Sequence, residues 1–248
     1  MIRMQNAGFA YDGRTVLRGL NLHIRPGEFV AVAGPNGAGK TSFAKLLNGL
    51  NRPTEGEVFV DGLDTRRARV SALSRSVGFL FQNPDRQLCR TTVREELLFG
   101  LRLHVRDEAE AARRLERALA DFALDPEENP LTAARAERQR IALASVVALG
   151  PRLLVLDEPG SSLDPLMRDR LCDRMREYLD DGDGRKSIIF STHNIADMEN
   201  AADYAVFMDK GRVIEQGFIE ELKEKYIVVS GDAENWEQAK SLLMSGSH

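Results

Sequence analysis

The stretch GPNGAGKT, residues 34–41, constrains the fold of this chain more than any other part of its sequence. It follows a short apolar run, EFVAVAG, which predicts a buried strand ending in glycine. It precedes TSFAKLLNGL, in which Phe43, Leu46, Leu47 and Leu50 recur at the spacing of one helical face. A strand, a glycine-rich loop and a helix in this order form the phosphate-loop pattern G-x-x-x-x-G-K-[ST]. We therefore predict a site for a nucleoside triphosphate.

Each residue type in this loop suits that ligand. Gly34, Gly37 and Gly39 let the backbone curl until its N–H groups face an anion, and the positive end of the following helix faces it too. Lys40 is placed to reach the β- and γ-phosphates, and the Thr41 hydroxyl can ligate Mg²⁺. The predicted nucleotide-binding residues are Gly34, Pro35, Asn36, Gly37, Ala38, Gly39, Lys40, Thr41 and Ser42.

An acidic pair supplies the second part of such a site. RLLVLDEP, residues 152–159, predicts a buried strand that ends at Asp157 and Glu158. Asp157 can hold Mg²⁺ directly or through water, and Glu158 can orient and deprotonate the attacking water. An acidic pair at a strand end can also serve solvation alone. The phosphate loop in the same chain favours the catalytic interpretation.

Further apolar runs predict the rest of an α/β fold. GEVFVDG, SVGFLFQ, SIIFSTH and YAVFMD predict strands, and the turn DKG predicts a hairpin with RVIEQG. Near-continuous apolar strands that alternate with helices indicate a mostly parallel sheet covered on both faces. Residues 86–150 contain no strand candidate, and Leu115, Leu119 and Phe122 lie along one predicted helical face. We interpret this region as a helical insert.

Composition argues against several other classes of protein. The chain has 34 basic and 38 acidic residues and a net charge of −4, so no global basic field predicts a nucleic-acid partner. Cys89 and Cys172 show no metal-ligand spacing and predict two thiols of a reduced protein. The N-terminus lacks the apolar core of a signal peptide, and IALASVVAL is too short for a membrane helix. Any membrane role must therefore come through a partner.

With these motifs in this order, residues 1–220 resemble the ATP-binding cassette (ABC) superfamily, whose ATPases pair a RecA-like core with a helical subdomain. The resemblance implies that Tyr11 stacks on adenine, that Gln82 touches Mg²⁺ and the lytic water, and that His193 reaches the γ-phosphate. Residues 161–164, SSLD, resemble the segment that communicates across the ATPase dimer. Without the resemblance, a lone tyrosine is more often a packing residue and a lone histidine a structural one.

The implied fold class is α/β, a P-loop NTPase with a RecA-like core, a mostly parallel sheet, an N-terminal antiparallel β portion and an inserted α-helical subdomain. We assign residues 1–85 and 150–225 to the core and residues 86–149 to the helical subdomain. Residues 226–248 form a C-terminal extension whose last three residues, GSH, resemble a cloning remnant.

The resemblance also implies the cofactors and the catalytic roles. ATP and Mg²⁺ would bind together, and Lys40 and the metal ion would neutralise phosphate charge while Glu158 and His193 position the water. The implied catalytic residues are Glu158, His193, Gln82 and Lys40, and the implied metal ligands are Thr41, Gln82 and Asp157.

A narrower resemblance lies in FQNPDRQL, residues 81–88, which is similar to the string found in energy-coupling factor and cobalt-type importer ATPases. Asn83, Pro84, Asp85 and Gln87 carry it, and the following TTVREELLFG also resembles that group. The implied function is ATP hydrolysis that drives import of a vitamin or a transition-metal ion at the cytoplasmic face of the cell membrane. The implied partners are a transmembrane subunit, a second ABC ATPase and a substrate-binding membrane subunit.

One stretch departs from the superfamily. A signature loop close to L-S-G-G-[QE] precedes [KR]QR there, and its serine and glycine N–H groups grip the γ-phosphate held by the opposite subunit. Aligned on RQRIALA, this chain has Ala134 at the serine, Arg135 and Ala136 at the two glycines, and Glu137 at the fifth position. A second alignment puts Thr132 at the serine, but residues 101–149 contain no glycine in either case.

The altered signature predicts an unequal ATPase pair. The lost serine hydroxyl removes a charge-assisted hydrogen bond worth about 1.5–3 kcal/mol, and side chains obstruct the backbone where glycine was bare. Because ATP at Lys40 is completed by the partner's signature, a heterodimer with an intact partner keeps one complete site on this chain. We favour that heterodimer over a homodimer. A divergent homodimer, a deliberately altered loop, or compensation by the charge of Arg135 would agree with the same sequence.

Rival functions come from other classes. One is an ABC ATPase that acts on ribosomes, DNA or protein clusters without a transporter, although such chains tend to carry two cassettes or long insertions. Another is the ATPase of a different type of ABC importer. A third is a regulatory subunit that binds ATP without hydrolysing it, against which the presence of Glu158 argues.

Overall fold

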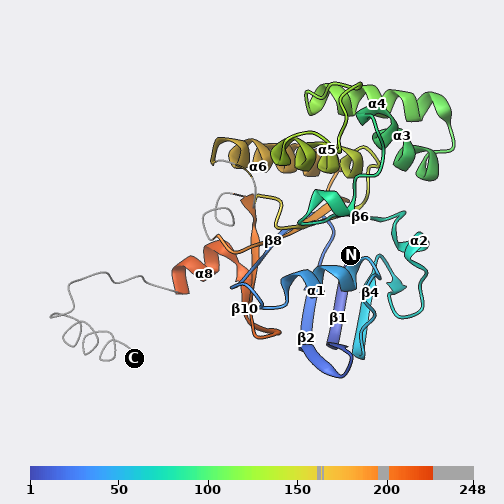
Figure 1. Ribbon diagram of the computed structural model, residues 1–248. Helices are drawn as coiled ribbons and strands as arrows, with labels where there is room; N and C mark the ends of the chain where they lie inside the picture. Colours follow the sequence, from blue (N-terminus) through green and yellow to red (C-terminus); the bar gives the residue numbers. More distant parts are fainter. Residues whose placement is uncertain (161–162, 164, 195–200, 226–248) are drawn as a thin grey trace, which may run out of the picture.

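Two β-sheets and the helices packed on them make up the computed structural model, which describes residues 1–160, 163, 165–194 and 201–225 (Figure 1). The strands are β1 (Ile2–Tyr11), β2 (Arg14–Ile24), β3 (Phe29–Ala33), β4 (Glu55–Val60), β5 (Leu63–Asp64), β6 (Val77–Leu80), β7 (Leu153–Asp157), β8 (Ser187–Thr192), β9 (Tyr204–Asp209) and β10 (Arg212–Phe218). The helices are α1 (Lys40–Leu47), α2 (Val70–Leu73), the 3₁₀ helix η1 (Pro84–Arg86), α3 (Val93–His104), α4 (Glu108–Asp121), α5 (Arg135–Val147), α6 (Pro165–Asp180) and α8 (Ile219–Lys225). Within the described ranges, no helix combines the length and the apolar character that a membrane crossing needs.

The larger sheet is mostly parallel, as the sequence predicts. Its strand order is β10-β9-β3-β8-β7-β6, and only β10 runs antiparallel to its neighbour, in the predicted hairpin with β9. The register sets Ala33 of β3 beside Thr192 of β8, and Asp157 of β7 beside Ser191 of β8. Because parallel strands end at the same edge of a sheet, the loops that follow β3, β6, β7 and β8 lie next to one another.

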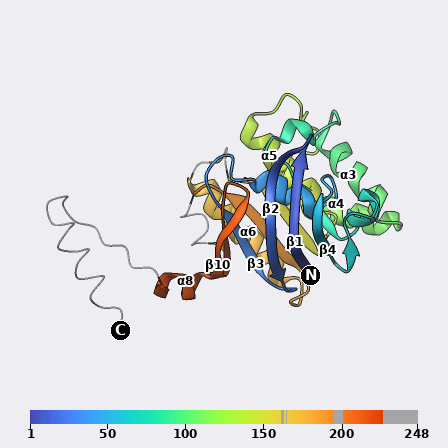
Figure 2. The same ribbon diagram turned by 90° about the horizontal axis from the view of Figure 1, so that it is seen from below.

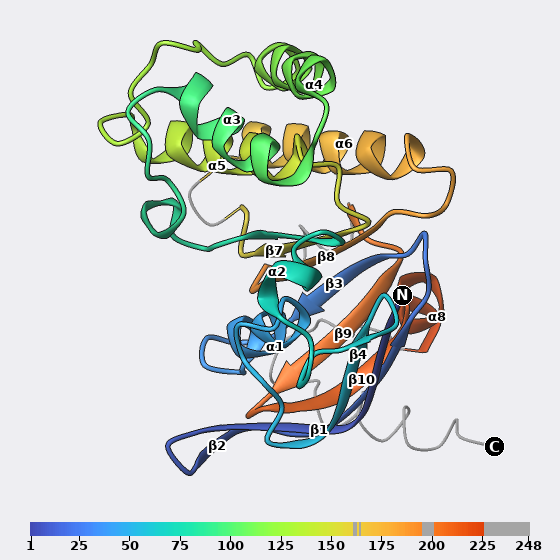
Figure 3. The same ribbon diagram turned by 90° about the vertical axis from the view of Figure 1, so that its right-hand side faces the viewer.

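Strand β3 is buried on both faces, which explains its continuous apolar sequence. Phe29, Ala31 and Ala33 belong to one core, together with side chains from α3, α4, α5 and α6. Val30 and Val32 point the other way and belong to a second core with α1 and the smaller sheet. Figure 3 shows these layers, with α3 to α6 above the parallel sheet and α1 between the two sheets.

The smaller sheet is the predicted N-terminal antiparallel portion, with strand order β2-β1-β4-β5 (Figure 2). Its inward side chains, among them Met4 and Leu17, share a core with Phe43 and Leu46 of α1. The two sheets meet at the turn between β9 and β10, where the N–H of Arg18 donates to the carbonyl of Gly211 over 2.8 Å. This contact fixes β2 beside the phosphate loop.

The helix after the phosphate loop is confirmed, but it is shorter than its apolar pattern predicts. α1 ends at Leu47, and Gly49 then adopts a φ of +76°. Leu50 lies beyond this turn, its N–H donates to Asn48 Oδ1 over 3.0 Å, and its side chain is 48% exposed. The prediction that Leu50 continues the buried face of the helix was therefore wrong. A left-handed glycine ends the helix before the helical spacing can bring Leu50 back to the core.

The chain between β6 and β7 contains only helices, as predicted. The Thr92 hydroxyl caps α3 by accepting the N–H of Glu95, and the Asp107 carboxylate caps α4 by accepting the N–H of Ala109. Leu115 and Leu119 are buried, whereas Phe122 follows the end of α4 and is only partly buried against the core. The division into a core and a separate helical subdomain stays a prediction, and the predicted extension at 226–248 lies outside the described residues.

We expect Phe43→Ala to lower the free energy of unfolding by about 3–5 kcal/mol, because it empties a fully buried site between the two sheets. Leu50→Ala is the matched control, since Leu50 is the neighbouring apolar residue that the fold leaves half exposed. Its expected effect is within about 0.5 kcal/mol. Chemical denaturation of the two variants measures both values, and equal losses would contradict the end of the helix at Leu47.

Candidate active site

Side chains from four loops meet at the carboxyl edge of the parallel sheet. The phosphate loop begins at Gly34 after β3, Gln82 follows β6, Glu158 follows β7, and His193 follows β8. Segments far apart in the chain are brought together only by the strand order and register. In open sheets of this kind, ligands bind outside the carboxyl ends of the strands.

The phosphate loop has the tight geometry that its glycines predict. A Cβ on Gly34 would lie 2.3 Å from the carbonyl oxygen of Met208 in β9, so only glycine fits there. Gly37 and Gly39 have φ values of +83° and +102°. The carbonyl of Ala38 accepts the N–H of Gly211 over 2.9 Å, which ties the loop to the β9–β10 turn. Helix α1 then begins directly at the end of the loop and directs its positive end toward it.

Lys40 folds back over its own loop. Its Nζ donates to the carbonyl oxygens of Gly34 (2.8 Å) and Pro35 (3.2 Å), and it lies 3.3 Å from Glu158 Oε1. The side chains of Lys40 and Glu158 are 5% and 11% exposed. A buried ammonium needs hydrogen-bond acceptors and an opposite charge, and here the loop carbonyls provide the acceptors and the carboxylate provides the charge.

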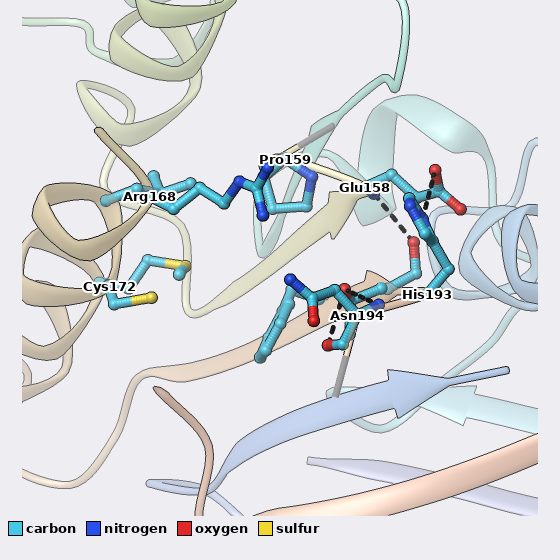
Figure 4. A pocket seen from close by; sticks show the side chains of 12 residues that line it. Glu158, Pro159, Arg168, Cys172, His193 and Asn194 are labelled. Carbon is cyan, nitrogen blue, oxygen red and sulfur yellow. Dashed lines mark hydrogen bonds and ion pairs between the residues drawn. The ribbon is translucent and has the colours of Figure 1, made fainter. Parts of the chain in front are cut away.

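Glu158 is the point on which the other predicted catalytic residues converge. The Gln82 amide donates from Nε2 to Glu158 Oε2 over 2.9 Å, and His193 Nδ1 lies 3.5 Å from the same oxygen. Figure 4 shows His193 directed at Glu158. Both residues line a cavity of about 350 Å³, which Arg168, Cys172 and Asn194 also line. The structure thus brings Lys40, Gln82 and His193 together around one carboxylate.

The backbone of Glu158 adopts an unusual conformation, with a φ of +48°. For a residue with a long side chain this left-handed region is unfavourable by about 1–3 kcal/mol, and such positions cluster at functional sites. Here the conformation turns the chain sharply after β7, directly at the residue on which the cluster converges.

Asp157 lies beneath Glu158 and is nearly buried, at 2% exposure. Its Oδ1 accepts hydrogen bonds from the hydroxyls of Thr41 (3.2 Å) and Ser191 (2.8 Å). Burial raises the pKa of Asp157 above its usual value, and the two hydroxyl hydrogen bonds oppose that rise.

The donors at this position suit Mg²⁺. Asp157 offers a carboxylate oxygen, and the Thr41 hydroxyl lies within hydrogen-bond distance of that carboxylate. The Gln82 amide nitrogen donates to Glu158, which leaves the amide oxygen of Gln82 for other partners. Within the described part of the chain, no three carboxylate, histidine or cysteine side chains gather into a metal cage. Mg²⁺ commonly binds to one or two carboxylates together with substrate phosphates and water, which is the arrangement these residues permit.

The other predicted nucleotide contacts differ in how exposed they are. Tyr11 ends β1, is 46% exposed, and packs edge-on against Phe9 with 4.5 Å between ring centroids. Its hydroxyl exchanges hydrogen bonds with the Asn51 side chain. Pro35 and Asn36 form the exposed tip of the phosphate loop, and the buried Ser42 lies in the first turn of α1. Stacking of adenine on Tyr11 stays a prediction, and SSLD lies outside the described residues except for Leu163.

The stretch that replaces the signature starts a helix at the surface. α5 begins at Arg135, with Ala134 at the N-cap and no side chain that caps it. Ala134, Arg135 and Ala136 are exposed, and the Arg135 side chain makes no hydrogen bond or ion pair with the described residues. Thr132, the alternative serine position, donates its hydroxyl to the Asn129 carbonyl over 3.3 Å.

The segment after Gln82 is fastened to α5. Asp85 and Arg138 form an ion pair of 2.7 Å, and the Gln87 amide donates to the carbonyl of Ala142 over 2.8 Å and to the hydroxyl of Ser145 over 3.1 Å. Asn83 caps η1 by accepting the N–H of Asp85. The residues that carry the narrower resemblance therefore connect Gln82 to the helix that begins with the altered signature.

Sequence reasoning missed Ser191. Its hydroxyl contacts Asp157 and the backbone of Glu158, and its side chain is 3% exposed. The available signal is a serine two residues before His193 on a predicted strand. That signal indicates a functional residue only once the β7–β8 register is known, because the register sets Ser191 beside Asp157.

A phosphate loop between β3 and α1, with an acidic pair at the end of a nearby parallel strand, defines the chain as a P-loop nucleoside triphosphatase. The family model described as "ABC transporter" matches residues 17–161. The chain belongs to the ABC transporter family, as an ATP-binding subunit and an ATPase.

Named relatives agree with this membership. A putative ABC transporter ATP-binding protein of Pyrococcus abyssi is 41% identical over 233 residues, which cover 90% of this chain and 82% of the relative. The energy-coupling factor transporter ATP-binding protein EcfA of Methanosarcina acetivorans is 36% identical over 221 residues, 88% of this chain and 79% of EcfA. Among solved structures, cbiO1 of Clostridium perfringens, part of the ABC transporter complex cbiONQ, has a TM-score of 0.80 and 29% identity, covering 90% of each chain.

We expect Asp157→Asn to raise the melting temperature of the free chain at pH 7. Because burial holds the pKa of Asp157 above its usual value, the folded state pays to keep the carboxylate ionised. An Asn keeps an oxygen for the Thr41 and Ser191 hydroxyls without the charge. A gain of about 1 kcal/mol would appear as a rise of about 2–4 °C.

The sign of the pH dependence follows from the raised pKa. Below the ordinary pKa of an aspartate, about 3.9, the carboxyl is protonated in both states and the mutation gains little. The free-energy cost of ionising Asp157 in the folded state grows as the pH rises through the pKa that Asp157 has in the folded chain. The stability gained by Asp157→Asn grows with it. Thermal unfolding at pH 4 and pH 7 measures it, with the exposed Asp180→Asn as the control. A pH-independent gain would contradict the prediction.

Proposed function

We propose that the chain is the ATP-hydrolysing subunit of an energy-coupling factor importer for a vitamin or a transition-metal ion, and that it works beside a second, different ATPase. The observation that carries the proposal is the convergence of Lys40, Gln82 and His193 on Glu158. The similarity to EcfA and to cbiO1 supports the type of importer.

ATP would replace the contacts that Lys40 makes in the free chain. The β- and γ-phosphates compete for the Lys40 ammonium with the loop carbonyls and with Glu158, so binding of nucleotide releases the Glu158 carboxylate. Tyr11 would stack on the adenine, and the amides of the phosphate loop would hold the phosphates. Nucleotide binding would thereby free Glu158 to act as the general base.

Hydrolysis would use the released carboxylate. The water oxygen would attack the γ-phosphorus while the bond to the β–γ bridging oxygen breaks and ADP leaves. Glu158 would accept the proton of that water, Gln82 would orient the water, and His193 would donate to the γ-phosphate. Thr41, Asp157 and Gln82 would hold Mg²⁺, which supplies positive charge to the phosphate oxygens when it is bound. The buried ion pair of Lys40 and Glu158 holds the two side chains at the site before nucleotide arrives.

We expect Glu158→Gln to lower kcat by about 10²–10⁴-fold, because it removes the general base. ATP affinity should be kept or increased, since the neutral amide no longer competes for Lys40. Glu177→Gln, an exposed position on α6, is the matched control. Turnover is measured in the complex purified from native membranes, and a Glu158→Gln complex as fast as the parent would refute the assignment.

The contacts of the segment after Gln82 support a link to a membrane partner. A displacement of residues 83–88 would move Gln82, which directly precedes them and contacts Glu158. It would also move α5 through the Asp85–Arg138 ion pair. A transmembrane subunit docked there, at the cytoplasmic face of the cell membrane, could therefore couple transport to the site. A substrate-binding membrane subunit would complete the importer.

Co-purification from native membranes tests this assembly. Mild detergent extraction should recover the chain with a polytopic membrane subunit and a second ABC ATPase, because both the transport role and the altered signature require them. Recovery with ribosomes, DNA or a protein cluster alone would favour an ABC ATPase without a transporter instead. A membrane complex that contains two copies of this chain and no second ATPase would reject the unequal pair but keep the importer.

The exposed start of α5 supports the second ATPase. In the proposed pair, this surface would face the nucleotide of the partner, so its missing glycines would impair the partner's site and leave the site at Lys40 intact. A homodimer would carry that defect twice.

We expect the combined change Ala134→Ser, Arg135→Gly and Ala136→Gly to raise the ATPase rate of the isolated chain by about tenfold or more. A restored hydrogen bond to charged phosphate is worth about 1.5–3 kcal/mol, and the glycines remove the obstruction. Adding Lys40→Ala should abolish the gain, which shows that it arises at the nucleotide site. No gain from the triple change would count against the unequal pair.

A further inference from the structure

We infer that Ser191 is a positioning residue that sets the metal-facing oxygen of Asp157 and the backbone of Glu158 with one hydroxyl group. The inference rests on the proposed function, since it takes Asp157 as a metal ligand and Glu158 as the base. Ser191 would act through these two residues and touch neither nucleotide nor metal.

Ser191 is held in place by the sheet. It lies near the carboxyl end of β8, beside Asp157 of β7 in the parallel register, and its side chain is 3% exposed. Its hydroxyl donates to Asp157 Oδ1 over 2.8 Å and accepts the backbone N–H of Glu158 over 2.9 Å. A hydroxyl has one donor and two acceptor positions, so both contacts can exist at once.

The first contact selects one oxygen of the carboxylate. Asp157 Oδ1 accepts from both Ser191 and Thr41, whereas Oδ2 accepts no hydrogen bond from the described residues. Oδ2 is therefore the oxygen left for a metal ion or for a water bound to it. Because Ser191 is buried in a strand, it restricts the rotation of the carboxylate before the metal arrives. Hydrogen bonds of this kind orient metal ligands, and their loss commonly costs about 10–100-fold in metal affinity or activity.

The second contact fixes the turn after β7. Glu158 has a φ of +48°, a conformation that a residue with a long side chain keeps only when its surroundings hold it there. The Ser191 oxygen takes the N–H at this turn and so anchors the backbone from which the Glu158 carboxylate extends. One side chain thus couples the metal ligand to the base.

The same strand supplies a matched control. Ser187 lies at the amino end of β8 and is fully buried. Its hydroxyl also makes two hydrogen bonds, donating to the Arg25 carbonyl over 3.2 Å and accepting the N–H of Gly27 over 3.0 Å. It differs from Ser191 in lying at the opposite end of the strand, away from the site.

The test compares Ser191→Ala, Ser191→Thr and Ser187→Ala in the full chain. Calorimetric titration measures ATP affinity in EDTA and at increasing Mg²⁺ concentration. Ser191→Ala should raise, by about tenfold or more, the Mg²⁺ concentration at which the gain in ATP affinity due to Mg²⁺ is half complete. It should leave the ATP affinity in EDTA unchanged. Ser191→Thr should restore the parent value, since it keeps the hydroxyl on a β-branched side chain that suits a strand. Ser187→Ala should leave both values unchanged, even if it lowers the melting temperature.

Hydrogen exchange supplies a readout without nucleotide. The peptide that contains Glu158 should exchange faster in Ser191→Ala than in Ser187→Ala, because only the first change removes the acceptor of the Glu158 N–H. Should Ser191→Ala not fold, Ser191→Cys replaces the hydroxyl by a weakly hydrogen-bonding thiol and should shift both measurements in the same direction.

Two results would overturn the inference, and they are distinguishable. An equal Mg²⁺ requirement in Ser191→Ala and Ser187→Ala, with the parent still dependent on Mg²⁺, would make Ser191 a structural residue only and leave the proposed function intact. A parent chain whose ATP affinity does not respond to Mg²⁺ would reject the proposed metal ligands, and the role of Ser191 with them.

Discussion

The close contact between the phosphate loop and strand β9 is the constraint on which the arrangement of this molecule depends. Any side chain at Gly34 would collide with the Met208 carbonyl, and the Ala38 carbonyl is tied to Gly211 in the next turn. Gly211 in turn accepts the N–H of Arg18 from the smaller sheet. The loop therefore sits at the junction of both sheets, and these contacts hold Gly34 and Ala38 in place before any ligand arrives. A preorganised set of amides costs little further ordering when it binds an anion.

Charge at the site is balanced around one glutamate. Buried charges are tolerated only when they are paired, and the Lys40 ammonium and the Glu158 carboxylate satisfy each other in the free chain. Gln82 and His193 approach the same carboxylate from two other strands. The Lys40 and Glu158 charges are therefore paired without nucleotide, and in the proposed function an incoming phosphate would exchange one favourable ion pair for another. This exchange lets the proposed base stay paired until the substrate takes its partner.

The sequence predicts local elements well and their contacts poorly. The phosphate loop, the acidic pair at Asp157 and the strands around them follow from patterns that span a few residues. Leu50 was misplaced because a single left-handed glycine outweighs helical spacing. Ser191 was missed because its importance comes from the register of β7 against β8, a relation between segments more than 30 residues apart that no local pattern records. The convergence of Lys40 and His193 on Glu158 likewise required the strand order, and the resemblance named the residues without giving their contacts.

The altered start of α5 has a consequence that depends on where α5 is anchored. Two contacts join this helix to the segment after Gln82, namely the Asp85–Arg138 ion pair and the hydrogen bonds of Gln87. Gln82 in turn donates a hydrogen bond to Glu158. None of these contacts uses the side chains of Ala134, Arg135 or Ala136, which lie exposed at the start of the helix, within one turn of Arg138. The residues that serve this chain's own nucleotide are thus separate from those that would serve a partner's. A chain built in this way can lose its contribution to a partner's site and keep its own site, because the two depend on different side chains of the same anchored helix.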